Sequence, residues 1–458
     1  MRLKAKRRFG VFATTLVVAV GARLVHAEPP RVMSLSPAHG DILVDPALAE
    51  IRVVFDQNMD TSSYAWTGGG ETFPKLTGKP TWVDARTCVL PVALVNSHFY
   101  QLGVNGGRFT GFRSTAGEPA MHQPLMFTTG PRQISEEYRA LIGHGVLDVF
   151  NREAMRALRE AIATHYSYRD RLGLDWDALF AEHAARLAAS TRSIEFALSA
   201  SLLLANAEDV HISIEAEGLR LQPHAVAAPA TFNFNAVRAR LDEYGEPSNL
   251  VQHGRIGDIG YLRINSWDGS HADDVGKALD FMRGHHALPA LIIDVRANGG
   301  GNEMLARRLA GCFIAEQTVY SKHRFVDPQA PGGFGPMADR TFGPAPDVPR
   351  FEGPVAVLIG PIVCSSNESF VAMMDQVPAC TLIGIRTLGS SGNPRPHDLS
   401  NGVTVFLPSW QDYLADGTML EGRGIAPDVP VEAGAADFMN GDPVFDRAVR
   451  YLHERLRR

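Results

Sequence analysis

Hydrophobic and polar positions alternate in short runs over the first part of the chain, from about residue 29 to residue 130. Two of these runs are 51–55 and 100–104, and residues that favour turns separate the runs. Alternation with a period of two, interrupted by Gly, Asn, Asp and Pro, is typical of a small antiparallel β-sandwich. We therefore predict a β-sandwich domain at 28–130.

The spacing of apolar residues becomes helical between residues 134 and 204. Met155, Leu158 and Ile162 are examples of apolar residues three or four positions apart. This period predicts two or three helices that pack on one another, so we expect a helical bundle over 131–210. The segment 143–145, Gly-His-Gly, is expected to be a loop within it.

Beyond residue 254, continuous apolar runs alternate with helical stretches. Strands are predicted at 259–264, 290–294, 355–359 and 381–385, and helices at 272–284, 303–314 and 365–376. Strands that are apolar on both faces and joined by helices form an α/β core, which we place at 211–458. The Gly- and Pro-rich stretch 327–349 is expected to be a long loop that could form a rim or lid.

The first 27 residues have the layout of a secretory signal peptide. A basic start is followed by an apolar run from Phe9 to Gly21 and by the small-residue exit Val25-His26-Ala27. The run is shorter than the roughly 20 residues that span a bilayer. An uncleaved N-terminal anchor is the alternative. In either case we expect an exported protein, periplasmic or secreted, with no integral membrane segment once a signal peptide is removed.

The composition excludes several classes of protein. With 45% hydrophobic and 21% charged residues among 458, the chain is neither a coiled coil, a collagen nor a disordered protein. The net charge is −6, and it falls by six more without the basic leader, which argues against a nucleic-acid partner. Four Cys are too few for a disulfide framework, and no Cys-x-x-Cys spacing indicates zinc; pairing of Cys312 with Cys380 stays open.

A glycine run is the first candidate for chemistry. It occupies 296–301, directly after the predicted strand that ends at Asp294. Glycines between a strand and a helix let a ligand approach the backbone, whose N–H groups can face a negative charge. The spacing fits neither Gly-x-Gly-x-x-Gly nor a P-loop, so we interpret Gly299 and Gly300 as candidate oxyanion-hole donors. A tight structural turn is the alternative.

Ser365 is the second candidate, because it lies where another predicted strand turns into a helix. A hydroxyl there would lie at a helix N-terminus, where amides favour a developing negative charge. Ser365 and Glu368 also have the spacing of a capping box, which is a purely structural interpretation. Cys364 is a rival nucleophile, although no activating partner is evident in the sequence.

These two elements resemble the C-terminal processing, or tail-specific, serine peptidases. That family has Asp-x-Arg-x-Asn-x-Gly-Gly after one strand and Ser-x-x-Glu after the next, which are present here at 294–301 and 365–368. A closing Gly-Ile-x-Pro-Asp matches 424–428. The resemblance covers about 134–431 and implies an α/β core of the Clp protease and crotonase type.

The resemblance also separates two branches of that family. The Ser–Lys branch carries its base where this chain has Ser390, and Lys322 is the only lysine beyond Gly300. The tricorn-like branch uses a Ser–His–Glu relay, whose Asp-x-His signature matches 209–211 and whose glutamate matches Glu421. An imidazole can accept a serine proton at neutral pH, and a carboxylate on its far nitrogen would fix the tautomer.

The resemblance therefore implies a serine endopeptidase that acts on unfolded or C-terminal peptide segments and needs no metal or cofactor. Ser365 would be the nucleophile, His211 the base and Glu421 its orienting group, with Gly299 or Gly300 and Ser366 as the oxyanion hole. A structural histidine at a helix end is the alternative for His211, and Glu421 could instead pair with a surface base. The oligomeric state stays open.

Two other functions remain possible at this point. One is a non-catalytic binding protein on the same fold, and the other is an esterase-like acyl hydrolase that uses the same residues. About fifty residues separate His211 from the strand containing Tyr261, which is too few for a PDZ domain. The strand-addition mode of PDZ recognition is therefore not expected.

The β-sandwich also has a resemblance of its own. The opening Ser36-Pro37, the segment 54–60 and the closing segment 127–129 occur in the order seen in bacterial Ig-like domains of exported proteins. The resemblance covers about 100 residues. It implies a domain that positions or docks its neighbour and carries no catalytic residues.

Overall fold

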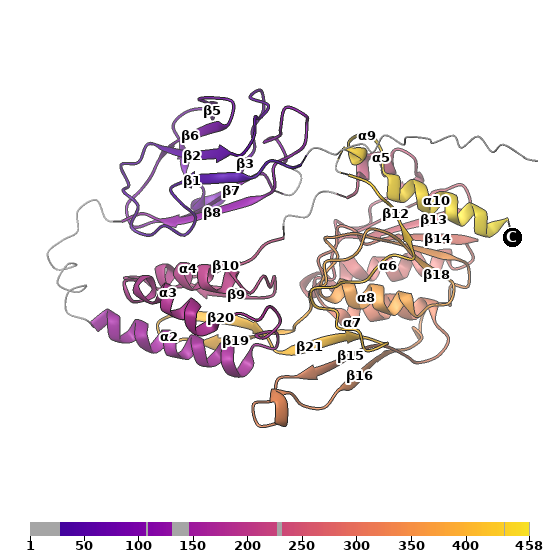
Figure 1. The fold of residues 1–458 in the computed structure, drawn as a ribbon. Coiled ribbons are helices and arrows are strands. Elements are labelled where there is room, and N and C mark those ends of the chain that lie inside the picture. The colour runs from indigo at the N-terminus through magenta and orange to yellow at the C-terminus, as the bar shows by residue number, and fades with distance from the viewer. Residues whose placement is uncertain (1–27, 107–108, 131–145, 227–230, 435, 458) are drawn as a thin grey trace, which may run out of the picture.

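The computed structural model describes residues 28–106, 109–130, 146–226, 231–434 and 436–457 (Figure 1). The predicted signal peptide and the predicted loop at 143–145 lie outside these residues. The described chain forms three parts: an N-terminal pair of sheets, a middle part of helices on a sheet, and a C-terminal α/β part.

The N-terminal part consists of two antiparallel sheets, as the alternating pattern predicts. One sheet contains β1 (Val32–Ser36), β2 (Glu50–Phe55), β6 (Thr87–Ala93), β4 (Lys75–Leu76) and β5 (Thr81–Trp82). The other contains β3 (Trp66–Thr67), β7 (Phe99–Val104) and β8 (Gln123–Thr128). Buried side chains of both sheets, including Ile51, Leu90 and Phe127, share one apolar cluster, so the sheets face each other.

The middle part differs from the predicted bundle because its helices pack on a sheet as well as on one another. The helices are α2 (Val146–His165), α3 (Trp176–Ala188) and α4 (Ser193–Ala205). The sheet has the order β10-β9-β20-β19, with β9 at Ser213–Ala216, β10 at Leu219–Leu221, β19 at Pro394–Asp398 and β20 at Val403–Pro408. Helix α4 is buried on almost every side. One of its buried residues, Phe196, shares a core with Ile214 of β9 and Val405 of β20. The strands that cover it come from distant sequence, which the local helical period does not reveal.

The C-terminal part is an α/β layer structure, as the apolar runs predict. Its sheet has the order β11 (Asp242–Gly245), β12 (Val251–Ile256), β13 (Ile259–Ile264), β14 (Ala290–Asp294), β17 (Val355–Ile359), β18 (Cys380–Gly384) and β22 (Val429–Pro430). From β13 onward the neighbouring strands are parallel. Helices α6 (Ala272–His285), α7 (Glu303–Ala310) and α8 (Ser366–Asp375) share one core, and α5 (Phe234–Arg238), α9 (Asp437–Asn440) and α10 (Pro443–Leu456) share another. The sheet therefore has a helical layer on each face.

The prediction of one continuous loop at 327–349 is wrong, because a strand interrupts it. This segment contains β16 (Ala338–Phe342), which forms a hairpin with β15 (Thr318–Phe325); β15 also pairs with β21 (Trp410–Leu414). Some of the Gly and Pro residues lie in the connection between β15 and β16, where Gly332 and Gly333 adopt positive φ, and the others follow β16. Gly and Pro favour turns, and the chain beyond this connection returns to pair with β15.

The N-terminal part is fixed to the middle part by an apolar contact. Phe99 and Met126, from β7 and β8, lie in the same core as helices α2 to α4. Gly40 adopts a φ of 87°, and a Cβ there would lie 2.6 Å from a methyl carbon of Leu202. Arg192 also donates a hydrogen bond to the carbonyl of Ser97 at 2.9 Å. None of the helices in the described ranges has both the length and the apolar character needed to cross a bilayer.

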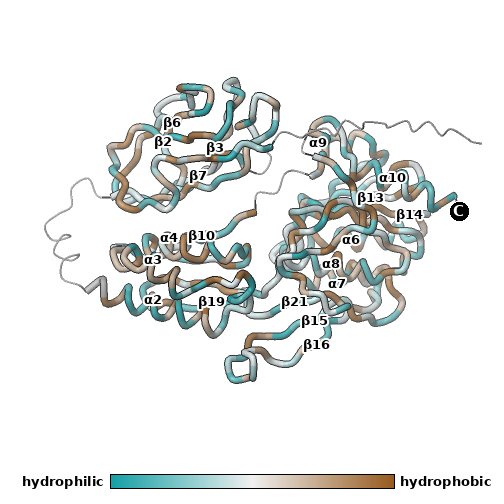
Figure 2. The backbone as a smooth tube through the Cα atoms, in the orientation of Figure 1, coloured by the Kyte–Doolittle hydropathy of each residue, from teal (hydrophilic) through white to brown (hydrophobic). Residues whose placement is uncertain are grey.

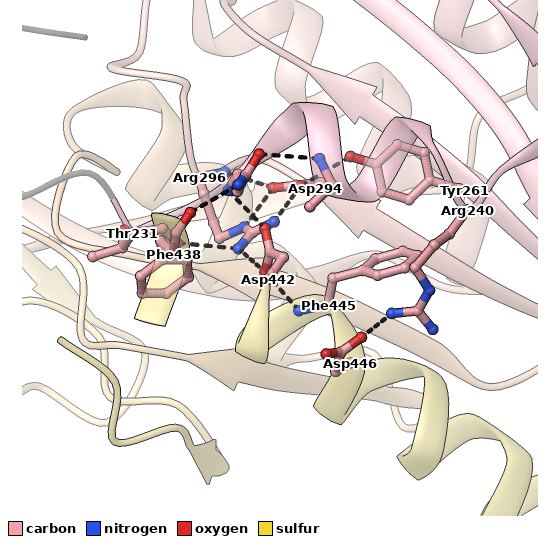
Figure 3. A network of polar contacts seen from close by, with 11 residues as sticks. Thr231, Arg240, Tyr261, Asp294, Arg296, Phe438, Asp442, Phe445 and Asp446 are labelled. Atoms are coloured by element: carbon pink, nitrogen blue, oxygen red, sulfur yellow. Dashed lines mark hydrogen bonds and ion pairs between the residues drawn. The ribbon is translucent and has the colours of Figure 1, made fainter. Parts of the chain in front are cut away.

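The strands at the centre of the sheet are apolar (Figure 2), and the carboxyl end of β14 lies in a buried ionic network (Figure 3). Arg296, directly after β14, donates hydrogen bonds to Asp294 at 2.7 Å and to Asp442 at 2.8 Å. Tyr261 of β13 donates to Asp294 at 3.0 Å. Burial disfavours the charge on Asp294, but Arg296 outweighs that effect and lowers the pKa of the carboxyl. The network ties the start of α10 to the strand that precedes the glycine run.

We expect Asp442→Asn to lower the free energy of unfolding by about 3–5 kcal/mol, because Arg296 would lose one of two buried carboxylate partners. Asp446→Asn is the matched control, since Asp446 pairs with Arg240 on a half-exposed part of the same helix. That change should cost less than about 1 kcal/mol. Chemical denaturation of both variants gives the comparison, and equal losses would contradict the role assigned to the buried network.

Candidate active site

Ser365 lies at the junction of β17 and α8 with a φ of 58° and a ψ of −133°, an unusual conformation for a residue other than glycine. Its backbone N–H donates to the carbonyl of Ser390 at 2.8 Å. Its side chain makes no capping hydrogen bond to α8. The capping box that the spacing allowed is therefore not formed, and the hydroxyl is not occupied by a structural role at the helix end.

Glu368 is used differently from a capping residue. Its buried carboxylate accepts hydrogen bonds from the Thr387 hydroxyl at 2.5 Å, the Gly389 N–H at 2.7 Å and the Ser390 N–H at 2.8 Å. Burial raises the pKa of Glu368 to about 7, although all three hydrogen bonds favour the ionised form. This carboxylate therefore fixes the segment 387–390 against the helix that starts after Ser365.

His211 lies just before β9 in the middle part of the molecule. Its backbone N–H donates to Asp209 at 2.8 Å, and Asp209 in turn accepts from the Tyr166 hydroxyl at 2.9 Å. Its Nδ1 lies 2.9 Å from the Ser390 hydroxyl. Burial lowers the pKa of His211, and the charge of Asp209 only partly offsets this effect. The lowered pKa favours the neutral ring, which is the form that a general base requires.

Glu421 lies in the segment that follows β21, and it is 5% exposed. The Ser390 hydroxyl donates to its Oε1 at 3.4 Å, and the Ser391 N–H donates to its Oε2 at 2.8 Å. Burial, and next the charge of Asp209, raise the pKa of Glu421 well above its usual value. The structure thus brings His211 and Glu421 together on the two sides of Ser390, rather than in direct contact within the described residues.

Sequence reasoning gave Ser390 no role beyond the absence of a lysine. The signal was present, because the position that resembles the base of the Ser–Lys branch still carries a hydrogen-bonding side chain. Lys322 lies on β15 and pairs with Asp339 at 3.5 Å. Among the described residues, no group of three or more His, Cys, Asp or Glu side chains is placed to hold a metal ion.

The glycine run packs directly against the turn at Ser365. Gly300 has a φ of 114°, and a Cβ there would lie 2.8 Å from the Ser365 Cβ. Its N–H already donates to the Asn298 side chain at 2.8 Å, so this amide is not free to act as an oxyanion donor. The N–H groups of Gly299 and Ser366 make no hydrogen bond within the described residues. Of the two glycines expected as oxyanion-hole donors, Gly299 is therefore the one with a free N–H among the described residues.

Two further side chains, which sequence analysis missed, hold the glycine run in place. Asn367 donates to the carbonyls of Val295 at 3.0 Å and Asn298 at 2.8 Å, and it accepts a hydrogen bond from the indole of Trp267 at 2.9 Å. All of these groups are buried. A neutral amide in a strand–helix–loop junction gives no distinctive sequence signal.

Cys364 is a poor candidate for the nucleophile. Its thiol donates to the carbonyl of Gly299 at 2.9 Å. Burial, followed by the charges of Glu368 and Glu421, raises the pKa of this thiol to about 12. A thiol with that pKa is protonated at neutral pH and unreactive. The four cysteines of the chain, Cys312 and Cys380 included, are all free thiols.

Residues 258–431 match the sequence model of peptidase family S41. This segment is a peptidase family S41 domain. It contains Gly299, Ser365, Ser390 and Glu421, whereas His211 precedes it. The S41 domain therefore supplies most of the candidate site, and the middle part of the molecule supplies the imidazole.

The chain also resembles named relatives over part of their length. It is 28% identical over 275 residues to the putative tricorn protease homolog 2 of Streptomyces coelicolor, which covers 58% of this chain and 21% of that protein. It is 23% identical over 195 residues to a probable CtpA-like serine protease of Staphylococcus epidermidis, which covers 42% of this chain and 38% of that protein. The match to the carboxy-terminal-processing protease of Bartonella bacilliformis is 24% identical and covers 40% of this chain and 41% of that protein. The chain spans between a fifth and two fifths of these relatives.

Solved structures share the fold. A putative peptidase from Parabacteroides merdae superposes with a TM-score of 0.58 at 24% identity, covering 66% of this chain and 96% of that one. Mature CPAF superposes with a TM-score of 0.50 at 12% identity, covering 67% of this chain and 97% of that one. These structures thus share the fold of about two thirds of the chain.

We expect Gly300→Ala to lower the free energy of unfolding by roughly 2–4 kcal/mol, because the new methyl would meet Ser365 and the backbone would be strained. Gly299→Ala is the matched control, since no atom lies within 4 Å of a Cβ at that position. The control should stay within about 0.5 kcal/mol of the parent. Denaturant unfolding of the two variants decides the matter, and equal stabilities would overturn the packing described for Gly300.

Proposed function

We propose that the protein is an exported serine endopeptidase, periplasmic or secreted, that hydrolyses peptide bonds in unfolded or C-terminal segments of polypeptides. The observation that carries this proposal is the position of Ser390. Its carbonyl is bonded to the backbone of Ser365, and its hydroxyl is bonded to His211 and Glu421. Ser365, the part-buried imidazole of His211 and the buried carboxylate of Glu421 are thereby all linked through one residue.

In the proposed reaction, the Ser365 oxygen attacks the scissile carbonyl while His211 accepts the serine proton at Nε2. His211 then donates that proton to the leaving amine, and water completes the cycle with the same histidine as base. The N–H groups of Gly299 and Ser366 stabilise the negative oxygen of the tetrahedral intermediate. Glu421 stabilises the imidazolium that forms during both steps.

The remaining parts of the chain are assigned supporting roles. The first 27 residues act as the export signal. The N-terminal part is a bacterial Ig-like domain, and its apolar contact with α2 to α4 makes it a fixed neighbour of the part that carries His211. We expect no PDZ domain to select the substrate, so the substrate is bound by the middle part and the S41 domain themselves.

A fluorophosphonate tests the proposed nucleophile, because this reagent modifies activated serines. The mature protein should be labelled, and Ser365→Ala and His211→Ala should each slow labelling on the order of 10³-fold or more. His286→Ala is the control, since His286 is exposed at the end of α6. A well-folded parent protein that takes up no label would refute the enzyme and favour a binding protein. Labelling without cleavage of an unfolded protein substrate would instead favour an acyl hydrolase.

The rate of labelling should rise with pH over the range from about 5 to about 9. His211 and Glu421 are both active in their deprotonated forms. Burial lowers the pKa of His211 from its ordinary value and raises the pKa of Glu421 well above its ordinary value. Acidification therefore first protonates Glu421 or His211 and removes the base. A labelling rate that is greatest at the acid end of this range would contradict the proposed roles.

A further inference from the structure

Ser390 uses every polar group it has within the candidate site. Its N–H donates to Glu368, its carbonyl accepts from the Ser365 N–H, and its hydroxyl contacts both His211 and Glu421. The side chain is buried, at 4% exposure. The two backbone hydrogen bonds hold residue 390 in place, so the two contacts of its hydroxyl do not depend on a movement of the backbone.

A hydroxyl has one hydrogen to donate, and this limits how the chain of contacts can be arranged. When Glu421 is ionised it can only accept, so the Ser390 hydrogen points to Oε1 at 3.4 Å. The Ser390 oxygen must then accept from His211, which requires the hydrogen of the ring to be on Nδ1. The lone pair of the neutral ring is consequently on Nε2, the nitrogen that the general base needs.

We propose that Ser390 is a positioning residue that sets the tautomer of His211 by passing a hydrogen bond from the imidazole Nδ1 to the carboxylate of Glu421. This role rests on the proposed peptidase function. It adds a fourth residue to the relay and makes the action of Glu421 on His211 indirect. When Nε2 takes the proton of Ser365, the hydrogen on Nδ1 stays on the nitrogen and points to the Ser390 oxygen. The hydroxyl hydrogen of Ser390 likewise stays on its oxygen and points to the carboxylate of Glu421. Only one proton moves.

The opposite arrangement arises when Glu421 is protonated. Its Oε2 accepts from the Ser391 N–H at 2.8 Å, so the added hydrogen sits on Oε1 and is donated to Ser390. Ser390 must then donate to Nδ1, and the ring hydrogen moves to Nε2, where it blocks the base. Besides His211, which is linked through Ser390, ionisable groups from several elements interact with Glu421 and favour one state or the other: Asp209, Tyr166, Tyr168, Arg171, Cys364 and Glu368.

No other described side chain can replace this bridge. The residue before His211 is Val210, which has no hydrogen-bonding side chain. The carboxylate of Asp209 is already occupied by the backbone N–H of His211 and by the Tyr166 hydroxyl. The Ser391 hydroxyl donates to Asp412 at 2.9 Å, away from the imidazole. Ser390 is thus the only hydrogen-bond partner of the Nδ1 atom among the described residues.

A double-mutant cycle tests the bridge through the rate of fluorophosphonate labelling. Ser390→Ala should slow labelling by roughly 10- to 100-fold, because the ring loses its tautomer preference. Glu421→Gln should slow it at least as much: the new amide oxygen takes the Ser391 N–H, the new NH₂ group donates to Ser390, and the ring is held in the blocked tautomer. The double variant should react at the same rate as Ser390→Ala, because the introduced amide has no route to the ring without the hydroxyl.

Ser199→Ala is the control for the cycle. Ser199 is fully buried in α4, and its hydroxyl has no hydrogen-bond partner within the described residues. This variant should be labelled at the parent rate. Chemical denaturation of each variant separates loss of fold from loss of rate, and Ser390→Ala keeps both backbone bonds of residue 390.

Nitrogen-15 NMR of the histidine rings gives a second readout that does not depend on activity. The resonances of His211 are assigned by their absence in His211→Asn. The parent protein at a pH where labelling is at its plateau should carry the ring hydrogen on Nδ1, and Glu421→Gln should carry it on Nε2. A structural role of Ser390 alone would not move that hydrogen.

The outcomes separate this inference from the proposed function. If the parent protein is not labelled, the peptidase proposal fails, whatever Ser390 does. If the parent is labelled but Ser390→Ala reacts at the parent rate, the bridge is refuted and the peptidase proposal stands. Two results would show that Glu421 acts on His211 without Ser390. One is a double variant in which the losses in labelling rate of the two single variants multiply. The other is a Glu421→Gln variant in which the His211 ring still carries its hydrogen on Nδ1.

Discussion

The hydrogen bonds that Glu368 accepts from the segment 387–390 are the constraint on which the candidate site depends. They attach this segment to the helix that starts after Ser365, so the proposed nucleophile and Ser390 are parts of one rigid unit. A carboxylate with a pKa near 7 in such a position carries a cost of burial, which its three donors offset. Without these bonds the Ser390 hydroxyl would have no fixed direction, and His211 and Glu421 would have no common partner.

The site also depends on the meeting of distant parts of the chain. His211 comes from the segment before β9, Ser365 from the S41 sheet, and Ser390 and Glu421 from segments on either side of β19 to β21. The strand β20 pairs with β9, so the chain that leaves the S41 sheet returns to the part that carries His211. The pairing of strands therefore brings the imidazole to the segment that follows β18, which no local sequence feature could do.

Sequence reasoning succeeded where local pattern decides structure. The apolar runs at 259–264, 290–294 and 355–359 are the strands β13, β14 and β17 with the predicted bounds, because a strand buried on both faces is apolar at nearly every position. It failed where partners are remote. The bundle at 131–210 is completed by strands from beyond residue 390, and the loop at 327–349 is a hairpin whose pairing depends on β15 and β21.

The same distinction applies to the site. Ser365, His211 and Glu421 were predicted from motifs, and the structure places them around a residue that the motifs mark only by its lack of a lysine. The commitment of the Gly300 amide to Asn298, and the support of the glycine run by Asn367 and Trp267, depend on three-dimensional geometry, which residue types at a given spacing do not specify.

The interlaced path of the chain also governs the order in which the protein can be made. Because Ala216 of β9 pairs with Val403 of β20, the middle part cannot complete its sheet until the chain has been synthesised beyond residue 403. Contacts of such large sequence separation form late in folding. A nascent chain that ends before β20 thus lacks the pairing that holds the serine and the histidine together, and the proposed peptidase cannot act on other polypeptides until β20 has been made.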